Sequence, residues 1–265
     1  MNILKRELRV GLRPFLFWTL GLFLLVFSGV VKYTGVEAGG ESARKLTESF
    51  PRIVRAVLGV VGLDIGSFGG YYAILAYYVL VVTAVYAVSL GGSAVSREAV
   101  DKTYEFVFTK PRSRAYILGY KLLAGIFYLA LYCLLSFAFS AAAVPALKLG
   151  EDVRPAMFLF SLAAFLCGMV FFALSALFAA ASARSERGAR LGNLFILAAF
   201  ALGVVCDMLE NSGLLRIFSP FQYFDPAELL RGRLDPIYTV LCLTIAAAAL
   251  YFAFRAFEKR DLTAS

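Results

Sequence analysis

Six long stretches without a charged side chain constrain the fold of this chain more than any other feature. They hold 18, 32, 26, 29, 16 and 19 residues in chain order. About 20 apolar residues in a helix cross the hydrocarbon core of a bilayer once, and none of the stretches is long enough to cross twice with a turn between. The fifth stretch is the shortest, so Arg190 or Asp207 must lie near a membrane interface. The sequence predicts six transmembrane helices, near residues 14–31, 70–92, 117–144, 157–181, 191–208 and 236–254.

The composition excludes a water-soluble protein. Of the 265 residues, 61% are hydrophobic and only 17% are charged, which leaves too little polar surface to cover a soluble globule. A net charge of +8 does not indicate nucleic-acid binding, because no basic stretch alternates with stacking aromatic residues on a polar face. The apolar run Pro14–Val31 is longer than the core of a cleaved signal peptide, and no small-x-small cleavage site follows it. We therefore expect one all-α integral membrane domain over residues 1–265.

The distribution of Lys and Arg predicts the orientation of this domain. With a cytoplasmic N-terminus, the cytoplasmic segments hold 16 Lys and Arg residues and 7 acidic ones, whereas the outer segments hold 10 and 11. Cytoplasmic loops of membrane proteins carry an excess of Lys and Arg. We therefore expect a multi-pass protein of the inner (plasma) membrane with both termini in the cytoplasm.

Residues 1–13 have the pattern of an amphipathic helix. Lys5, Arg6, Arg9 and Arg13 fall within an arc of about 100° on a helical wheel, and apolar residues fill the rest. This pattern predicts an interfacial helix on the inner leaflet. Its basic arc suits either the anionic head groups of membrane lipids or a cytoplasmic partner.

Two outer segments are too long to be simple turns. In residues 32–68, apolar residues recur at helical spacing, and Pro51 is expected to kink or restart the helix. In residues 209–235, Pro220 and Pro226 interrupt apolar pairs, which predicts short broken helices that partly re-enter the outer leaflet. The aromatic residues of the second segment form either an outer gate or an interfacial aromatic belt; they are Phe218, Phe221, Tyr223 and Phe224.

Residue types that carry catalysis are largely missing. The chain has no histidine, and its four cysteines fall in four different spans or at their edges, so neither a Cys-x-x-Cys metal site nor a histidine base is expected. It also lacks the G-x-x-x-x-G-K-[ST] loop that binds phosphate. We expect no catalytic residue, no metal and no cofactor bound by this chain itself, and no hydrolysis of ATP by that route.

The segment 93–114 has the most specific pattern. Arg97 with Asp101, and Glu98 with Lys102, are oppositely charged pairs at i,i+4 spacing, so the second span is expected to continue as a helix into the cytoplasm. Pro111 then ends the helix, and Arg112 and Arg114 begin the return to the membrane. The simplest alternative is a solvated loop that only sets the topology.

The order of residues in this segment resembles a known family. Arg97-Glu98, then Lys102-Thr103-x-Glu105, then Pro111-x-Ser113-Arg114, and finally Lys121, is similar to the first cytoplasmic loop of the type-2 permease subunits of ATP-binding cassette (ABC) transporters. The match covers about 30 residues closely, and Lys102 stands where a Gly is usual. The six spans, the N-terminal helix and the closing sequence 257–262 resemble the family more loosely.

The resemblance implies partners and a site. In such permeases this loop forms a coupling helix that rests in a groove on a nucleotide-binding subunit, which holds ATP and Mg. By resemblance the contact candidates are Glu98, Lys102, Thr103 and Glu105. A second permease copy or a homologue completes the membrane part. The resemblance places the coupling interface on Arg97, Glu98, Asp101, Lys102, Thr103, Glu105, Pro111, Arg112, Arg114 and Lys121.

The cargo is constrained by the absence of charge inside the spans. Buried ionisable residues usually mark the path of an ion or a polar substrate, and here only Asp207 stands at the edge of a span. A hydrophobic or amphipathic cargo is therefore favoured, with export implied by the resemblance. The hydroxyls and rings of Tyr77, Tyr78 and Tyr86 suit a substrate path, or they serve as interfacial anchors and packing. The alternative function is a secondary, ion-coupled transporter without an ATPase partner.

Overall fold

The computed structural model describes residues 3–100, 113–146, 153–182, 185–209 and 213–259. Over these residues the chain is helical and contains no strand. Six helices are long and apolar enough to cross a membrane, which confirms the six predicted spans. They are α1 (Ile3–Glu48), α3 (Phe68–Val100), α5 (Arg114–Ala146), α6 (Arg154–Ala181), α7 (Ser185–Met208) and α9 (Pro236–Lys259).

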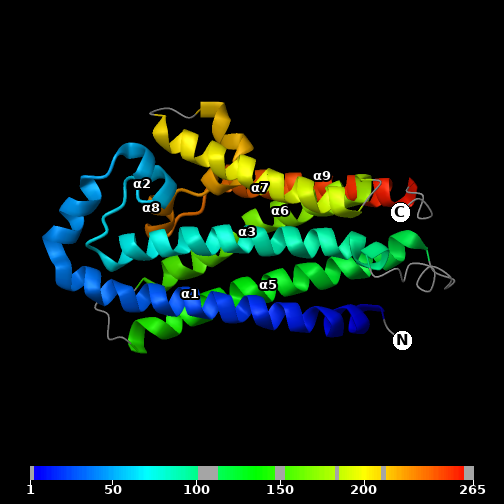
Figure 1. Cartoon of the computed structure of the whole chain (residues 1–265), viewed down its shortest axis with the longest axis horizontal. Coiled ribbons are helices and arrows are strands. Elements are labelled where there is room, and N and C mark those ends of the chain that lie inside the picture. The colour runs from blue at the N-terminus through cyan, green and yellow to red at the C-terminus, as the bar shows by residue number, and fades with distance from the viewer. Residues whose placement is uncertain (1–2, 101–112, 147–152, 183–184, 210–212, 260–265) are drawn as a thin grey trace.

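The long helices lie side by side, and both termini lie at the same end of the bundle (Figure 1). We call this end the termini end. The last described turn of α3 and the first turn of α5 also lie there, so the segment between them joins the bundle at the termini end (Figure 1). The short helices α2 (Arg52–Leu58) and α8 (Pro226–Leu230) lie at the opposite end, which we call the far end.

Helix α6 is the centre of the bundle, in contact with α3, α5, α7 and α9. Small residues allow these helices to approach closely. A Cβ atom added to Gly91 of α3 would lie only 2.1 Å from the carbonyl oxygen of Phe172 in α6. On the other side of α6, Ala173 packs with the buried Ala246 and Ala249 of α9. The outer helices consequently keep apolar faces exposed, as expected of a bundle surrounded by lipid.

Helix α1 differs from the sequence-based expectation in its boundaries. We expected a separate interfacial helix over residues 1–13, but α1 runs without interruption from Ile3 through Pro14 to Glu48. Pro14 removes one backbone hydrogen bond without ending the helix. The contacts of Glu7 and Leu8 with α3 and α5, described below, hold this first part of α1 against the bundle. Lys5, Arg9 and Arg13 remain exposed.

The elements of the far end agree with the predicted helix breaks. Pro51 precedes α2 and restarts the helix after α1, as one of the two expected outcomes. Gly59, with φ of 68°, ends α2 in the left-handed conformation that favours glycine. Between α7 and α9 the described residues 213–235 form three short helices, which confirms the predicted broken helices; they are η1 (Gly213–Phe218), η2 (Pro220–Gln222) and α8.

Candidate functional site

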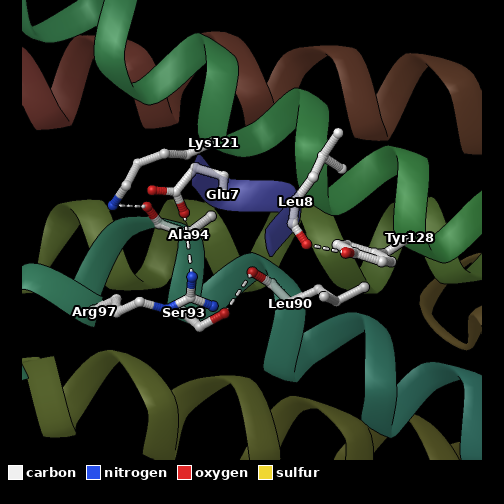
Figure 2. A network of polar contacts seen from close by, with 8 residues as sticks. All are labelled: Glu7, Leu8, Leu90, Ser93, Ala94, Arg97, Lys121 and Tyr128. Atoms are coloured by element: carbon white, nitrogen blue, oxygen red, sulfur yellow. Dashed lines mark hydrogen bonds and ion pairs between the residues drawn. The ribbon is translucent and has the colours of Figure 1, made fainter. Parts of the chain in front are cut away.

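An ion pair joins α1 to α3 at the termini end. Glu7, in the second turn of α1, lies 3.2 Å from the guanidinium of Arg97, in the last turn of α3 (Figure 2). The Glu7 side chain is only 6% exposed and that of Arg97 is 25% exposed. A buried carboxylate is costly without a charged partner. The position of Arg97 near the C-terminus of its helix is also favourable for a cation, because backbone carbonyls there carry partial negative charge.

Helix α5 joins the same network through two side chains. The Nζ of Lys121 donates a hydrogen bond of 3.0 Å to the carbonyl oxygen of Ala94 in α3, although Lys121 is only 5% exposed. The hydroxyl of Tyr128 donates to the carbonyl oxygen of Leu8 in α1 (Figure 2). Helices α1, α3 and α5 are thus linked pairwise by polar side chains, within four turns of their ends. We call this set the termini-end network: Glu7, Leu8, Ala94, Arg97, Lys121 and Tyr128.

The termini-end network borders both ends of the predicted coupling loop. Arg97 lies near the start of the predicted segment 93–114 and Lys121 follows its end, and the structure brings both into one network. The predicted continuation of the second span as a helix is confirmed as far as Val100. Arg114 begins α5, and Glu98 lies in α3 with a side chain outside the described part. The other predicted contacts also lie outside the described residues and remain predictions; they are Asp101, Lys102, Thr103, Glu105, Pro111 and Arg112.

Sequence reasoning missed Glu7. It is the partner of Arg97 across 90 positions of sequence, and such a distance leaves no local pattern. One signal was present: Glu7 is the only acidic residue among the basic residues of the first 13 positions. A single acidic residue in a basic segment indicates that its carboxylate can pair with a Lys or Arg side chain from another helix.

The three candidate tyrosines make contacts with different helices, although the rings of Tyr77 and Tyr78 lie 6.1 Å apart, and the substrate path stays a prediction. Tyr86 is 1% exposed and packs between Trp18 of α1 and Tyr132 of α5, with ring centroids 5.3 and 4.9 Å away. Tyr77 points instead toward α7, where its ring lies 6.4 Å from that of Phe200. The hydroxyl of Tyr78 donates a 3.1 Å hydrogen bond to the carbonyl oxygen of Leu58 in α2. Each tyrosine therefore serves a different helix contact.

The broken helices after α7 reach deep between the spans. The Sγ of Cys167 in α6 lies 3.1 Å from the carbonyl oxygen of Pro220. Cys167 is 13 residues from the first residue of α6, which is about 20 Å along a helix about 42 Å long. Pro220 therefore lies near the middle of this span. The hydroxyl of Ser219 donates a 2.8 Å hydrogen bond to the carbonyl oxygen of Ala199, and the amide of Gln222 a 3.1 Å bond to that of Gly203. The geometry agrees with a partly re-entrant element, which we call the far-end plug (residues 213–230).

The candidate gate aromatics divide into three buried residues and one exposed residue. Phe221 is 5% exposed and packs on Phe171 of α6, with ring centroids 5.0 Å apart. Tyr223 stacks on Tyr238 of α9 at 5.2 Å, and Phe224 is also buried. Phe218, in contrast, is 67% exposed.

The far-end plug also holds a cation and a cavity that sequence reasoning did not single out. Arg216 donates from Nε to the carbonyl oxygen of Gln222, and its guanidinium carbon lies 4.9 Å from the ring centre of Tyr238. A cavity of about 40 Å³ lies between the plug and the helices α3 and α6, and its wall includes Tyr77, Cys167 and Phe221. Apolar rings and backbone acceptors, rather than ion pairs, dominate the contacts of this element with α6 and α7.

Among the described residues, no group of three or more His, Cys, Asp or Glu side chains is placed so that it could hold a metal ion.

A family described as ABC-2 family transporter protein matches residues 1–262. No match to this chain was found among curated proteins.

Proposed function

Because the chain belongs to the ABC-2 family of transporter proteins, we propose that it is the membrane subunit of an ATP-driven exporter of a hydrophobic or amphipathic compound. The family consists of membrane permease components that generally work with a separate ATP-binding subunit. In our proposal that subunit binds ATP and Mg²⁺ and docks on residues 93–114, with both termini of this chain in the cytoplasm. The observation that carries the proposal is the termini-end network, which holds Ala94 and Arg97 at the start of this segment and Lys121 just after its end.

The network supports a mechanism for transmitting force. Closure of the ATPase subunits pushes on the loop, which is attached to α3 at Val100 and to α5 at Arg114. The contacts of Arg97 with Glu7, and of Lys121 with Ala94, link these two helices to each other and to α1. The three helices then move as one body, so a push on the loop reaches the membrane interior.

The far end supports the other half of the mechanism. The far-end plug closes the bundle with Phe221, Tyr223 and Phe224, whose contacts with α6 and α9 are chiefly between rings. These rings carry no charge, and the one cation of the plug described above, Arg216, is only half-buried where it lies over Tyr238, so outward opening has a small electrostatic cost. Of the charged residues described, only Glu7 and Lys121 are buried, and both belong to the termini end. A cargo without a strong charge suits such an interior.

A second copy or a homologue of this chain completes the membrane part in our proposal. Two coupling loops are needed to meet two ATPase subunits. Large apolar side chains stay exposed along α1, α7 and α9, as in Phe17, Leu197 and Val240, which are 77%, 65% and 62% exposed. These faces are available to lipid and to a second bundle.

The test is co-purification with an ATPase. The tagged chain is co-expressed with candidate ATP-binding subunits and isolated in mild detergent. We expect an ATPase in a 1:1 ratio that hydrolyses ATP, and a weaker association when Glu98 and Glu105 are both replaced by Ala. Glu258→Ala is the matched control, since Glu258 is an exposed acid in the last turns of α9. A folded chain that retains no ATPase would contradict the proposal and favour the ion-coupled transporter.

A further inference from the structure

Three buried hydroxyls without a hydrogen-bond partner belong to the helices α1, α3 and α5. They are those of Thr19 in α1, Tyr86 in α3 and Tyr132 in α5. Tyr86 and Tyr132 are 1% and 0% exposed, and their ring centroids are 4.9 Å apart. Trp18, which precedes Thr19, places its ring 5.3 Å from that of Tyr86. Among the described residues, one further buried side-chain atom lacks a partner, the Nε of Arg55 in α2 at the far end.

Other hydroxyls of the same helices have partners. The hydroxyl of Tyr72 in α3 donates to the Oγ of Ser140 in α5, and that of Tyr71 donates to the carbonyl oxygen of Gly29 in α1. A threonine hydroxyl inside a helix can donate to a carbonyl oxygen three or four positions earlier. Four other threonines of the described helices make this bond; they are Thr34, Thr83, Thr239 and Thr244. The three hydroxyls without partners are therefore an exception within this bundle.

The tyrosine pair lies at mid-depth of its helices. Tyr86 is 18 positions from the first residue of α3 and 14 from its last, and Tyr132 has the same place in α5. Either end is thus about 20 Å or more away along the helix axis. Lipid acyl chains offer no hydrogen-bond partner at this depth, and a buried hydroxyl without a partner destabilises the fold. Polar groups left unsatisfied in a packed interior indicate a functional site.

We propose that the hydroxyls of Tyr86 and Tyr132 are the polar end of a binding site for an uncharged, largely apolar compound with a hydrogen-bond acceptor. Each hydroxyl has one proton to donate, so the compound must supply an oxygen or nitrogen lone pair. Among the described residues, the buried charges belong to the termini-end network, so a charged compound finds no counter-ion here. Trp18 is half-buried beside Phe17, which is 77% exposed, and a compound dissolved in the bilayer reaches the pair past this indole.

This site narrows the chemistry of the cargo to apolar compounds that carry an acceptor such as a carbonyl or ether oxygen. The identification of the bound compound with the cargo rests on the proposed function, whereas the binding itself does not. Binding is measured on this chain without an ATPase subunit. Failure of the binding test therefore leaves the co-purification test untouched, and the reverse also holds.

The single tryptophan of the chain, Trp18, reports directly on the site because its ring packs on Tyr86. The full-length chain is reconstituted in phosphatidylcholine vesicles and titrated with TEMPO, an uncharged nitroxide quencher whose oxygen accepts hydrogen bonds. Bromocyclohexane, an apolar quencher without a strong acceptor, is titrated in parallel. The matched control is Leu197→Trp in a Trp18→Phe background, because Leu197 lies in the middle of α7 and is 65% exposed.

We expect the ratio of the TEMPO to the bromocyclohexane quenching constant to be about fivefold higher at Trp18 than at the control position, the factor contributed by one neutral hydrogen bond. The double replacement Tyr86→Phe with Tyr132→Phe should lower the ratio to the control value without lowering thermal stability. Tyr72→Phe should leave the ratio unchanged, because that hydroxyl already has a partner. Equal ratios at the two tryptophan positions, as hydroxyls occupied by ordered water would give, or an excess that survives the double replacement, would overturn the proposal.

Discussion

The two ends of this bundle are held together by different forces. At the termini end, charged side chains cross between helices: Glu7 pairs with Arg97, and Lys121 binds the carbonyl oxygen of Ala94. At the far end, the plug is held by aromatic rings, by uncharged donors such as Ser219, and by Arg216, whose guanidinium lies over the ring of Tyr238 rather than on a carboxylate. Directional, charge-assisted bonds fix relative geometry more strictly than ring contacts do. One end is therefore suited to transmitting a displacement, and the other to separating and closing again.

The largest effect should come from breaking the ion pair on one side only. Arg97→Ala leaves the carboxylate of Glu7 buried without its cation. A fully buried unpaired charge costs 3–5 kcal/mol; because Arg97 is a quarter exposed, we expect a loss of about 2–3 kcal/mol in stability. Thermal unfolding in detergent measures it.

The double replacement Arg97→Gln with Glu7→Gln removes both charges and should recover most of this loss. Arg114→Ala is a control at the same end, on an exposed residue. Equal destabilisation by Arg97→Ala and by the double replacement would show that the charge pairing is not what holds α1 to α3.

A smaller effect is expected at the far end. Phe221→Ala removes a ring that packs on Phe171 and enlarges the 40 Å³ cavity below the plug. Leaving a hole at a buried Phe costs about 3 kcal/mol in soluble proteins, and the short plug can partly collapse into the space, so we expect about 1–2 kcal/mol. The distinguishing readout is leakage of a small fluorescent dye from vesicles, which should rise in Phe221→Ala.

Phe218→Ala provides the comparison for leakage, since Phe218 belongs to the same element but is 67% exposed. It should leave leakage unchanged. Identical leakage in both variants would argue against Phe221 as part of a closure.

The smallest changes in stability are expected when a tyrosine is replaced by Phe, and they should differ between hydroxyls that have a hydrogen-bond partner and hydroxyls that have none. Tyr128→Phe loses the bond to the carbonyl oxygen of Leu8 and should cost about 1 kcal/mol. The hydroxyls of Tyr86 and Tyr132 are buried without a hydrogen-bond partner among the described residues. Their replacement by Phe should be neutral or slightly stabilising, because it removes an unsatisfied polar group. Thermal unfolding of the three variants checks the order, and a loss in Tyr86→Phe as large as in Tyr128→Phe would contradict it.

Much of the fold could be predicted because membrane spans leave a one-dimensional signal. A run of uncharged residues about 20 long has few alternatives to a spanning helix, and Pro51, Pro220 and Pro226 mark helix breaks by their chemistry. The interfacial helix expected over residues 1–13 has no end of its own in the structure, where α1 continues through residue 13, because a charge cluster does not end a helix. Tertiary contacts of Glu7 and Leu8 with α3 and α5, which the sequence pattern does not show, hold residues 3–13 against the bundle.

The candidate site could be predicted only in part. The loop was recognised from a local pattern of charges, and Arg97 and Lys121 belong to that pattern. Their partners do not, since Glu7 is 90 positions from Arg97 and the acceptor of Lys121 is the backbone of Ala94. Backbone acceptors carry no sequence signal. For the same reason, the division of Tyr77 and Tyr86 between opposite sides of α3 follows from packing with α7 and α5 rather than from their spacing alone.

The most direct measurement is a charge-swap cycle on the ion pair in the assembled transporter. The ATP hydrolysis rate of the complex is compared for the wild type, Glu7→Arg, Arg97→Glu and the double swap, with ATPase subunits held at a fixed ratio. If the termini-end network couples α1 to the loop, each single swap should lower the rate markedly and the double swap should restore it. Single swaps that leave the rate unchanged in folded complexes would contradict this coupling.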